Sequence, residues 1–242
     1  MKIRHTYILA QAAVSFLLFS SCSKDFLDTK IDTYQTPEAI ISNRGTLFSF
    51  ANSIYAALPN GFTALDNNLF SPASDESFDT QVSAQNVRLF TQGKLSPLNG
   101  GNTNDVYKSR YDGIRAANFF LDYSANYHEF LLRNRDTTTE SSVVAFQNDS
   151  ANISWFRAEA HIARAYYYSE LIKRFGGVPI VNTVFSNVTA QDIPQSSYEE
   201  VVKFIVDEID QHIDSLQENW KTSDFNSYDG RFSKVSALAL KS

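Results

Sequence analysis

The chain has 242 residues, with 21 basic against 27 acidic side chains and a formal net charge of −6. Hydrophobic residues make up 43% of it and aromatic residues 14%, so it can bury a core and is not compositionally disordered. An acidic chain lacks the basic surface that neutralises phosphates, so nucleic acid is not expected as a partner.

The N-terminus carries the pattern of a secretory signal. Lys2 and Arg4 precede an apolar stretch over 7–21, which is shorter than the roughly 20 residues that a membrane-spanning helix needs. Two serines then stand directly before Cys22, the one cysteine of the chain, as in a bacterial lipoprotein signal. We therefore predict that residues 1–21 are removed and that Cys22 is acylated.

Lipidation gives this lone cysteine a role, because an exported chain with one cysteine cannot form an internal disulfide. More than one acyl chain makes membrane anchoring stable. The alternative is an ordinary cleaved signal followed by an incidental cysteine. Residues 22–36, which include the lipidated cysteine, are polar and predict a tether, and this leaves 37–242 as the folded domain.

Helical periodicity begins at Thr36 and Pro37, which suit an N-cap and a first helical turn. Apolar residues then share one helical face as far as Leu58. From 62 to 102 no helical period holds, and Gly, Asn, Ser, Asp and isolated aromatic residues dominate. Long irregular segments inside a folded domain are often functional, so this loop is the candidate for binding.

Further helices are expected in the second half of the chain. The segment over 158–175 is rich in alanine and tyrosine and ends at Gly176, which suits a left-handed C-cap, so it predicts a helix packed on more than one side. A polar connection is expected over 136–154, and a capping box formed by Ser197 and Glu200 starts another helix. Together the expected helices are 37–58, 103–134, 158–175, 197–217 and an incomplete one in 229–242.

No catalytic constellation emerges. His128 and Glu129 begin a zinc-protease motif, but Leu132 stands where its second histidine belongs. His161 and His212 each stand alone on a helix. A pair of carboxylates of the glycosidase kind is not excluded by spacing, yet the acidic residues of these helices are interpreted as solvated faces: Glu159, Glu170, Glu199, Glu200, Asp207 and Glu208. The sequence predicts no enzyme, no cofactor and no metal site.

One stretch carries a family resemblance. Residues 157–181 combine an Ala-Glu-Ala start, the pair Arg164–Ala165, three consecutive tyrosines and Phe-Gly-Gly-Val-Pro. This stretch resembles the SusD/RagB-like family of outer-membrane nutrient-binding lipoproteins. Further matching features follow in order: "DFLD" after the cysteine, "SDE" at 74–76, "YDGIRAANFFL" at 111–121, and 197–210 leading to "GRFSKVSALAL" at 230–240.

The resemblance implies a mostly α-helical fold in which tetratricopeptide-like helix pairs support long irregular loops, with the family's C-terminal part missing. It also implies a lipid-anchored protein on the outer face of the bacterial outer membrane. Such a protein captures a glycan or other nutrient for carbohydrate uptake by a SusC-like TonB-dependent transporter. The alternative is a helical-repeat scaffold lipoprotein without a small-molecule ligand.

Candidate ligand-binding residues lie in the loop over 62–104. Sugars are held by an aromatic face together with a few polar groups, and Asp75, Arg88, Phe90 and Asn102 offer both kinds of contact.

The resemblance further suggests O-glycan attachment at Asp-Ser/Thr-x sites of the kind that bacteria carrying this family use. Three segments fit this pattern: 136–138, 149–151 and 214–216.

Overall fold

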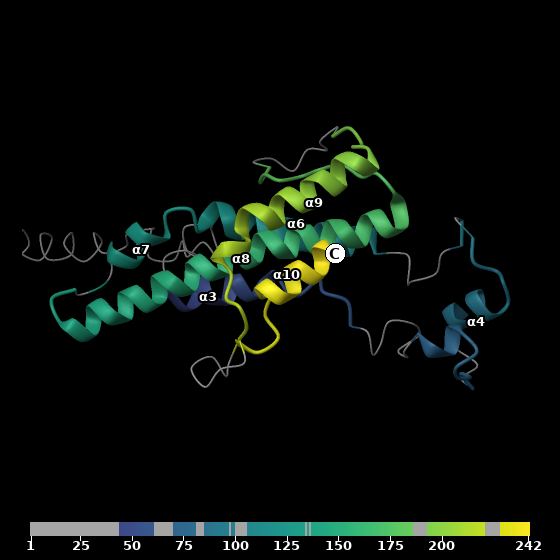
Figure 1. Ribbon diagram of the computed structural model, residues 1–242, viewed down its shortest axis with the longest axis horizontal. Helices are drawn as coiled ribbons and strands as arrows, with labels where there is room; N and C mark the ends of the chain where they lie inside the picture. Colours follow the sequence, from purple (N-terminus) through teal and green to yellow (C-terminus); the bar gives the residue numbers. More distant parts are fainter. Residues whose placement is uncertain are drawn as a thin grey trace, which may run out of the picture. The chain divides into compact units, whose positions relative to one another are not determined.

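The computed structural model describes residues 44–60, 70–80, 85–96, 98–99, 106–133, 135, 137–185, 193–220 and 228–242. The expected signal, tether and helix start at Pro37 lie outside these residues. The described elements are α3 (Arg44–Ser53), η3 (Ser71–Ala73), α4 (Gln85–Thr91), α6 (Tyr107–Tyr123), α7 (Tyr127–Arg133), α8 (Glu140–Phe175), α9 (Tyr198–His212), η4 (Ile213–Ser215) and α10 (Lys234–Lys241) (Figure 1). None of these helices is long and apolar enough to cross a membrane.

The longest helix is α8, and it begins 18 residues before the alanine- and tyrosine-rich segment. Thr139 caps it: the Thr139 side chain accepts from the Ser142 amide, and the Ser142 side chain accepts from the Thr139 amide. The expected polar connection over 136–154 is therefore wrong from residue 140 onward. The capping box overrides the polar composition, because it satisfies amide groups that the first turn leaves free.

The buried polar residues of this first half of α8 have partners. Asp149 accepts from Arg44 Nε at 2.7 Å and is also paired with Arg135. Ser150 Oγ lies 3.0 Å from His128 Nδ1. Asp149 and Ser150 are both buried, so the suggested glycan attachment at 149–151 is not compatible with the fold.

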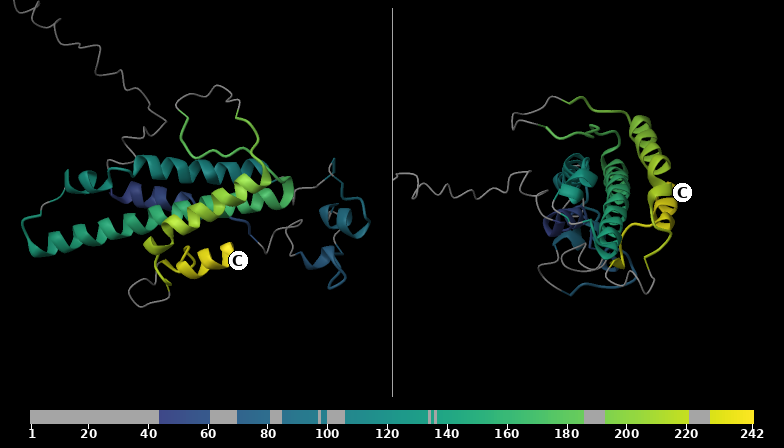
Figure 2. Two further views of the ribbon diagram at one scale, coloured as in Figure 1. Left: turned by 45° about the horizontal axis from the view of Figure 1, so that its top comes forward. Right: turned by 90° about the vertical axis from the view of Figure 1, so that its left-hand side faces the viewer.

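Helix α8 lies between two layers, with α3 and α6 on one side and α9 on the other, where α9 also contacts α10 (Figure 2). Helices α6 and α9 run antiparallel to α8, whereas α3 runs parallel to it, because Arg44 at the start of α3 pairs with Asp149 and Ile54 just beyond its end meets Tyr167. Tyr107 at the start of α6 meets Phe175 at the end of α8, with ring centroids 5.2 Å apart. On the other side Tyr168 packs on Phe204 in the middle of α9, and the earlier His161 stacks on His212 at its end. These contacts confirm that the tyrosine-rich helix is covered on more than one side.

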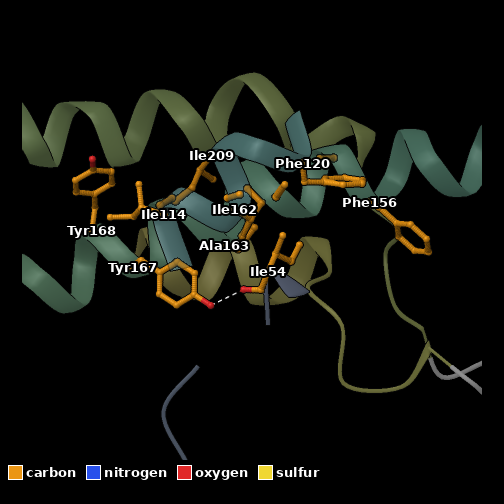
Figure 3. Packing of buried hydrophobic residues seen from close by; sticks show 14 of the residues in the cluster. Ile54, Ile114, Phe120, Phe156, Ile162, Ala163, Tyr167, Tyr168 and Ile209 are labelled. Atoms are coloured by element: carbon orange, nitrogen blue, oxygen red, sulfur yellow. Dashed lines mark hydrogen bonds between the residues drawn. The ribbon is translucent and has the colours of Figure 1, made fainter. Parts of the chain in front are cut away.

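The core is centred on α8. Tyr167 and Tyr168 are fully buried, and so are the alanines at 160, 163 and 165, which let the neighbouring helices approach closely (Figure 3). The Tyr167 hydroxyl donates to the backbone carbonyl of Ile54, just beyond α3. Tyr168 accepts from the Val181 amide at 2.6 Å. Each buried hydroxyl therefore has a partner, as a dry core requires.

Capping residues mark the end of α8 and the start of α9, and α10 follows with a partly exposed apolar face. Gly176 is the C-cap of α8 as expected, and its φ of 69° is one that L side chains rarely adopt, but its ψ of −133° differs from that of the expected left-handed helical cap. The expected capping box of Ser197 and Glu200 is confirmed. On α10, Val235 and Leu238 are 67% and 55% exposed, whereas Ala237 is buried between them.

The approach of α6 to α8 depends on Gly113. A Cβ atom added there would lie 2.5 Å from Cε2 and 2.6 Å from Cζ of the buried Tyr167 ring. Alanine normally gains about 1 kcal/mol over glycine within a helix. Overpacking of a dense core costs about 1–3 kcal/mol, so the clash should outweigh that gain.

We therefore expect Gly113→Ala to lower the free energy of unfolding by up to about 2 kcal/mol in urea titration, the difference between these two effects. Arg115→Ala, at an exposed position of the same helix, serves as the control and should change stability by less than about 0.5 kcal/mol. A stabilised Gly113→Ala variant would contradict the close packing of α6 on Tyr167.

Candidate functional site

The segment expected to bind ligand contains more regular structure than its sequence indicates. Within the described residues of 62–104, η3 forms a single 3-10 turn and α4 forms two turns of α-helix. The absence of helical structure expected for 62–104 is therefore wrong at 85–91. A helix of seven residues is too short for a repeating apolar stripe, and its buried residue Val87 packs with Ala73 and Phe90 in a small separate cluster.

Hydroxyl groups fold the chain after η3 into a tight turn. Ser74 Oγ donates to the Ser71 carbonyl at 2.8 Å and accepts from the Glu76 amide at 3.3 Å. Ser77 Oγ donates to Ser71 Oγ at 3.0 Å. This turn holds Asp75 at its exposed outer end. The motif "SDE" therefore has a local structural role, because serine side chains satisfy the backbone groups of the turn.

The four candidate ligand residues fall in different places. Asp75 is exposed in this turn, whereas Arg88 and Phe90 are half-buried on α4. Phe90 packs against Val87 and so helps to hold η3 on α4. Asn102 lies outside the described residues. Their role in ligand binding remains a prediction.

Two other phenylalanines of this segment present more ring surface. Phe78 is 86% exposed and Phe70 is 47% exposed. Solvent-exposed aromatic rings offer a flat apolar surface to a ligand, and Asp75 stands three residues before Phe78. An exposed ring and an exposed carboxylate within one short segment can together hold a polar ligand with apolar faces.

A second cluster of functional groups lies among α6, α8 and α9. Arg164 on α8 donates from Nη2 to both carboxylate oxygens of Glu208, at 2.8 and 2.7 Å, and from Nε to Glu208 Oε2 at 3.0 Å. Its Nη1 donates to Asn118 on α6 at 2.7 Å and to the Asn182 carbonyl at 3.3 Å. Arg164 therefore joins both helix layers to the segment that follows α8.

Two histidines complete this cluster. His161 Nδ1 lies 3.0 Å from Glu208 Oε2. The rings of His161 and His212 stack in parallel, with centroids 3.5 Å apart and planes 8° apart. Their rings border an open pocket of about 200 Å³, whose other polar lining comes from Tyr127, Ser154, Arg157 and Ser215.

The electrostatics of the cluster favour an ionised carboxylate beside neutral imidazole. Burial raises the pKa of Glu208, but the hydrogen bond with His161 and the charge of Arg164 outweigh it, so the pKa lies below its ordinary value. Burial lowers the pKa of His161; Glu208 opposes this shift, and the charges of His212 and Arg164 add to it. Around neutral pH the His161 imidazole is therefore uncharged.

The sequence-based interpretations of the histidines and of several glutamates on α8 and α9 are wrong. His161 and His212 do not stand alone, because the antiparallel packing of α8 and α9 brings them together. Glu159, Glu170 and Glu208 are buried and paired with arginines and do not form solvated faces. One available signal was the four-residue spacing from Glu208 to His212, which places both on one helical face.

The family is settled by a match that covers nearly the whole chain. A family model, SusD-like_3, described as "Starch-binding associating with outer membrane", matches residues 25–242. The chain belongs to the SusD-like family. The resemblance seen in the sequence is thereby confirmed, while no curated protein sequence gives a significant match.

Solved structures support the same fold. A SusD-like protein from Bacteroides fragilis matches with a TM-score of 0.59 and 22% identity, over 84% of this chain and 35% of its own. A laminarin-binding SusD-like protein matches with a TM-score of 0.57 and 20% identity, over 82% of this chain and 39% of its own. Surface glycan-binding protein A from Bacteroides uniformis matches with a TM-score of 0.56 and 19% identity, over 82% and 41%.

At these identities the structures establish the fold, and the chain spans about two fifths of their length. The expected mostly α-helical SusD-like architecture of paired helices is confirmed.

Proposed function

We propose that this SusD-like chain belongs to a lipid-anchored protein of the bacterial outer membrane, which binds a glycan at the cell surface without cleaving it. The observation that carries the proposal is the family match over residues 25–242. Two of the similar structures are named as laminarin-binding and surface glycan-binding proteins, which supports a glycan as the ligand class. In this account the protein passes its ligand to a SusC-like TonB-dependent transporter.

The segment around η3 and α4 is the proposed ligand contact. Exposed Phe78 and Phe70 supply ring faces, and Asp75 supplies a hydrogen-bond acceptor for hydroxyl groups. Arg88, Phe90 and Asn102 stay in the proposal as further contacts or supports. The helices α6, α8 and α9 act as a scaffold, because their large side chains pack in the core or form buried ion pairs.

The test is calorimetric titration of the purified chain against a panel of soluble glycans that includes laminarin and starch fragments. We expect saturable binding of at least one glycan and no release of reducing ends during incubation. Absence of binding across the panel would favour the alternative, a scaffold lipoprotein without such a ligand. Release of reducing ends would contradict the non-catalytic proposal.

Lipid anchoring through Cys22 gives a separate prediction. We expect Cys22→Ser to move the protein from the membrane fraction to the soluble fraction of the producing bacterium, since the acyl chains supply the membrane affinity. Cell fractionation with immunoblotting measures this change. Thr29→Ser, in the same predicted tether, should leave the protein in the membrane fraction. A Cys22→Ser variant that stays with the membrane would rule out the lipid anchor.

A further inference from the structure

The cluster between α8 and α9 has the composition of a metal site. Among the described residues, His161, Glu208 and His212 each bring one ligand atom to within 4.8 Å of the others. His161 comes from α8, and the other two come from α9. The three side chains therefore meet only because the two helices pack together.

Neighbouring groups orient two of these side chains, His212 and Glu208, in the way that supporting residues orient metal ligands. His212 Nδ1 lies 2.8 Å from the Glu208 backbone carbonyl. A carbonyl oxygen only accepts, so Nδ1 carries the proton of this bond and Nε2 keeps a free lone pair. Arg164 fixes the carboxylate of Glu208 through both of its oxygens.

We propose that His161, Glu208 and His212 bind a divalent transition-metal ion of the zinc class at the wall of the pocket. Two imidazoles and one carboxylate suit Zn²⁺, Ni²⁺ or Cu²⁺, whereas Ca²⁺ and Mg²⁺ prefer sets made of oxygen ligands. Three protein ligands leave a fourth position of a tetrahedral ion open, and the pocket gives water or a ligand access to it.

The stacked rings define what must move on binding. An ion lies in the plane of each imidazole that binds it, and two parallel rings cannot both point a lone pair at one ion. Because its bond to the Glu208 carbonyl holds His212, the His161 ring is the one that turns out of the stack when the metal binds. It gives up its 3.0 Å contact with Glu208 Oε2, and the adjoining pocket gives it room. Because Arg164 already balances the charge of Glu208, affinity is expected to be weaker than for a set with two unpaired carboxylates.

A bound ion would link α8 to α9 and should raise the midpoint of thermal unfolding. The experiment is isothermal titration of the metal-free chain with Zn²⁺ and with Ni²⁺, together with thermal melts in each metal. We expect one ion per chain and a higher melting temperature. His161→Gln and His212→Gln should each weaken binding at least about tenfold and abolish the thermal shift.

Two controls exclude other sources of metal binding. His128→Gln removes an exposed histidine on α7 and should leave the affinity unchanged. Cys22→Ser should also leave it unchanged, which shows that the thiol is not the ligand. Absence of one-to-one binding in the unchanged protein, or a loss in only one of the two histidine variants, would overturn the proposed site.

Discussion

Replacing Arg164 with methionine is expected to lower the free energy of unfolding by about 3–5 kcal/mol, because it leaves the carboxylate of Glu208 buried without its charged partner. The loss is large against the 5–15 kcal/mol that typically stabilises a folded domain. The bond from Arg164 to Asn118 is lost as well, so the contact between α6 and α9 through Arg164 disappears. Urea unfolding of the variant at neutral pH measures the change.

A double-mutant cycle separates the ion pair from the rest of the effect. Glu208→Gln keeps the shape of the side chain but removes its charge. In the Arg164→Met/Glu208→Gln double variant no charge is left unpaired, so we expect it to be more stable than Arg164→Met alone. If the two single losses simply add, the pair is not the source of the destabilisation.

Replacing Arg231 with methionine is expected to have an effect of similar size. Arg231 Nε donates to both oxygens of the fully buried Glu159, at 3.1 and 2.8 Å, and its guanidinium lies 3.9 Å from the centroid of the Phe156 ring. Tyr55 also donates to Glu159, at 2.6 Å. Loss of Arg231 leaves a buried carboxylate without its ion-pair partner, which costs about 3–5 kcal/mol at neutral pH.

The pH dependence of this variant has a defined sign. Burial raises the pKa of Glu159 against the opposing charge of Arg231, so removing Arg231 raises it further. A carboxyl group whose pKa is higher in the folded state stabilises the fold below its unfolded pKa, and this stability is lost as pH rises through the folded value. The difference from the unchanged protein should therefore grow as the pH rises above the ordinary carboxyl pKa.

Urea unfolding at several pH values tests this trend. Adding Glu159→Gln to the Arg231→Met variant removes the titrating group and should flatten the curve. A loss that stays constant across these pH values would show that Arg231 acts through packing alone.

Sequence reasoning predicted the packing helix well, because its signals are local. Alanines at helical spacing, a run of tyrosines and a glycine stop all lie within one segment, and they suffice to predict that α8 is covered on both sides. The first half of α8 was missed because Asp149 and Ser150 look like loop residues. Their burial depends on Arg44, Arg135 and His128, which are distant in the chain.

The same limit explains the candidate site. The pairing of His161 with His212 depends on which faces of α8 and α9 meet. Periodicity in the sequence shows which residues share a face of one helix, but it does not show which faces of two helices pack together. In the segment over 62–104, the half-burial of Phe90 depends on its contact with Val87, whereas Phe78 stays exposed. Substitution of Phe78 therefore tests ligand contact more directly than substitution of Phe90, which also packs against Val87.

Affinity of Phe78→Ala for a glycan that the unchanged chain binds is the measurement that tests the proposed function most directly. Truncating a central ring of a binding site costs more than about 1 kcal/mol, so we expect at least about a fivefold loss of affinity with the melting temperature unchanged. Phe185→Ala, which removes an exposed ring after α8, should bind as the unchanged chain does. Equal affinity of Phe78→Ala and Phe185→Ala for that glycan would contradict the placement of the ligand at the η3 and α4 segment.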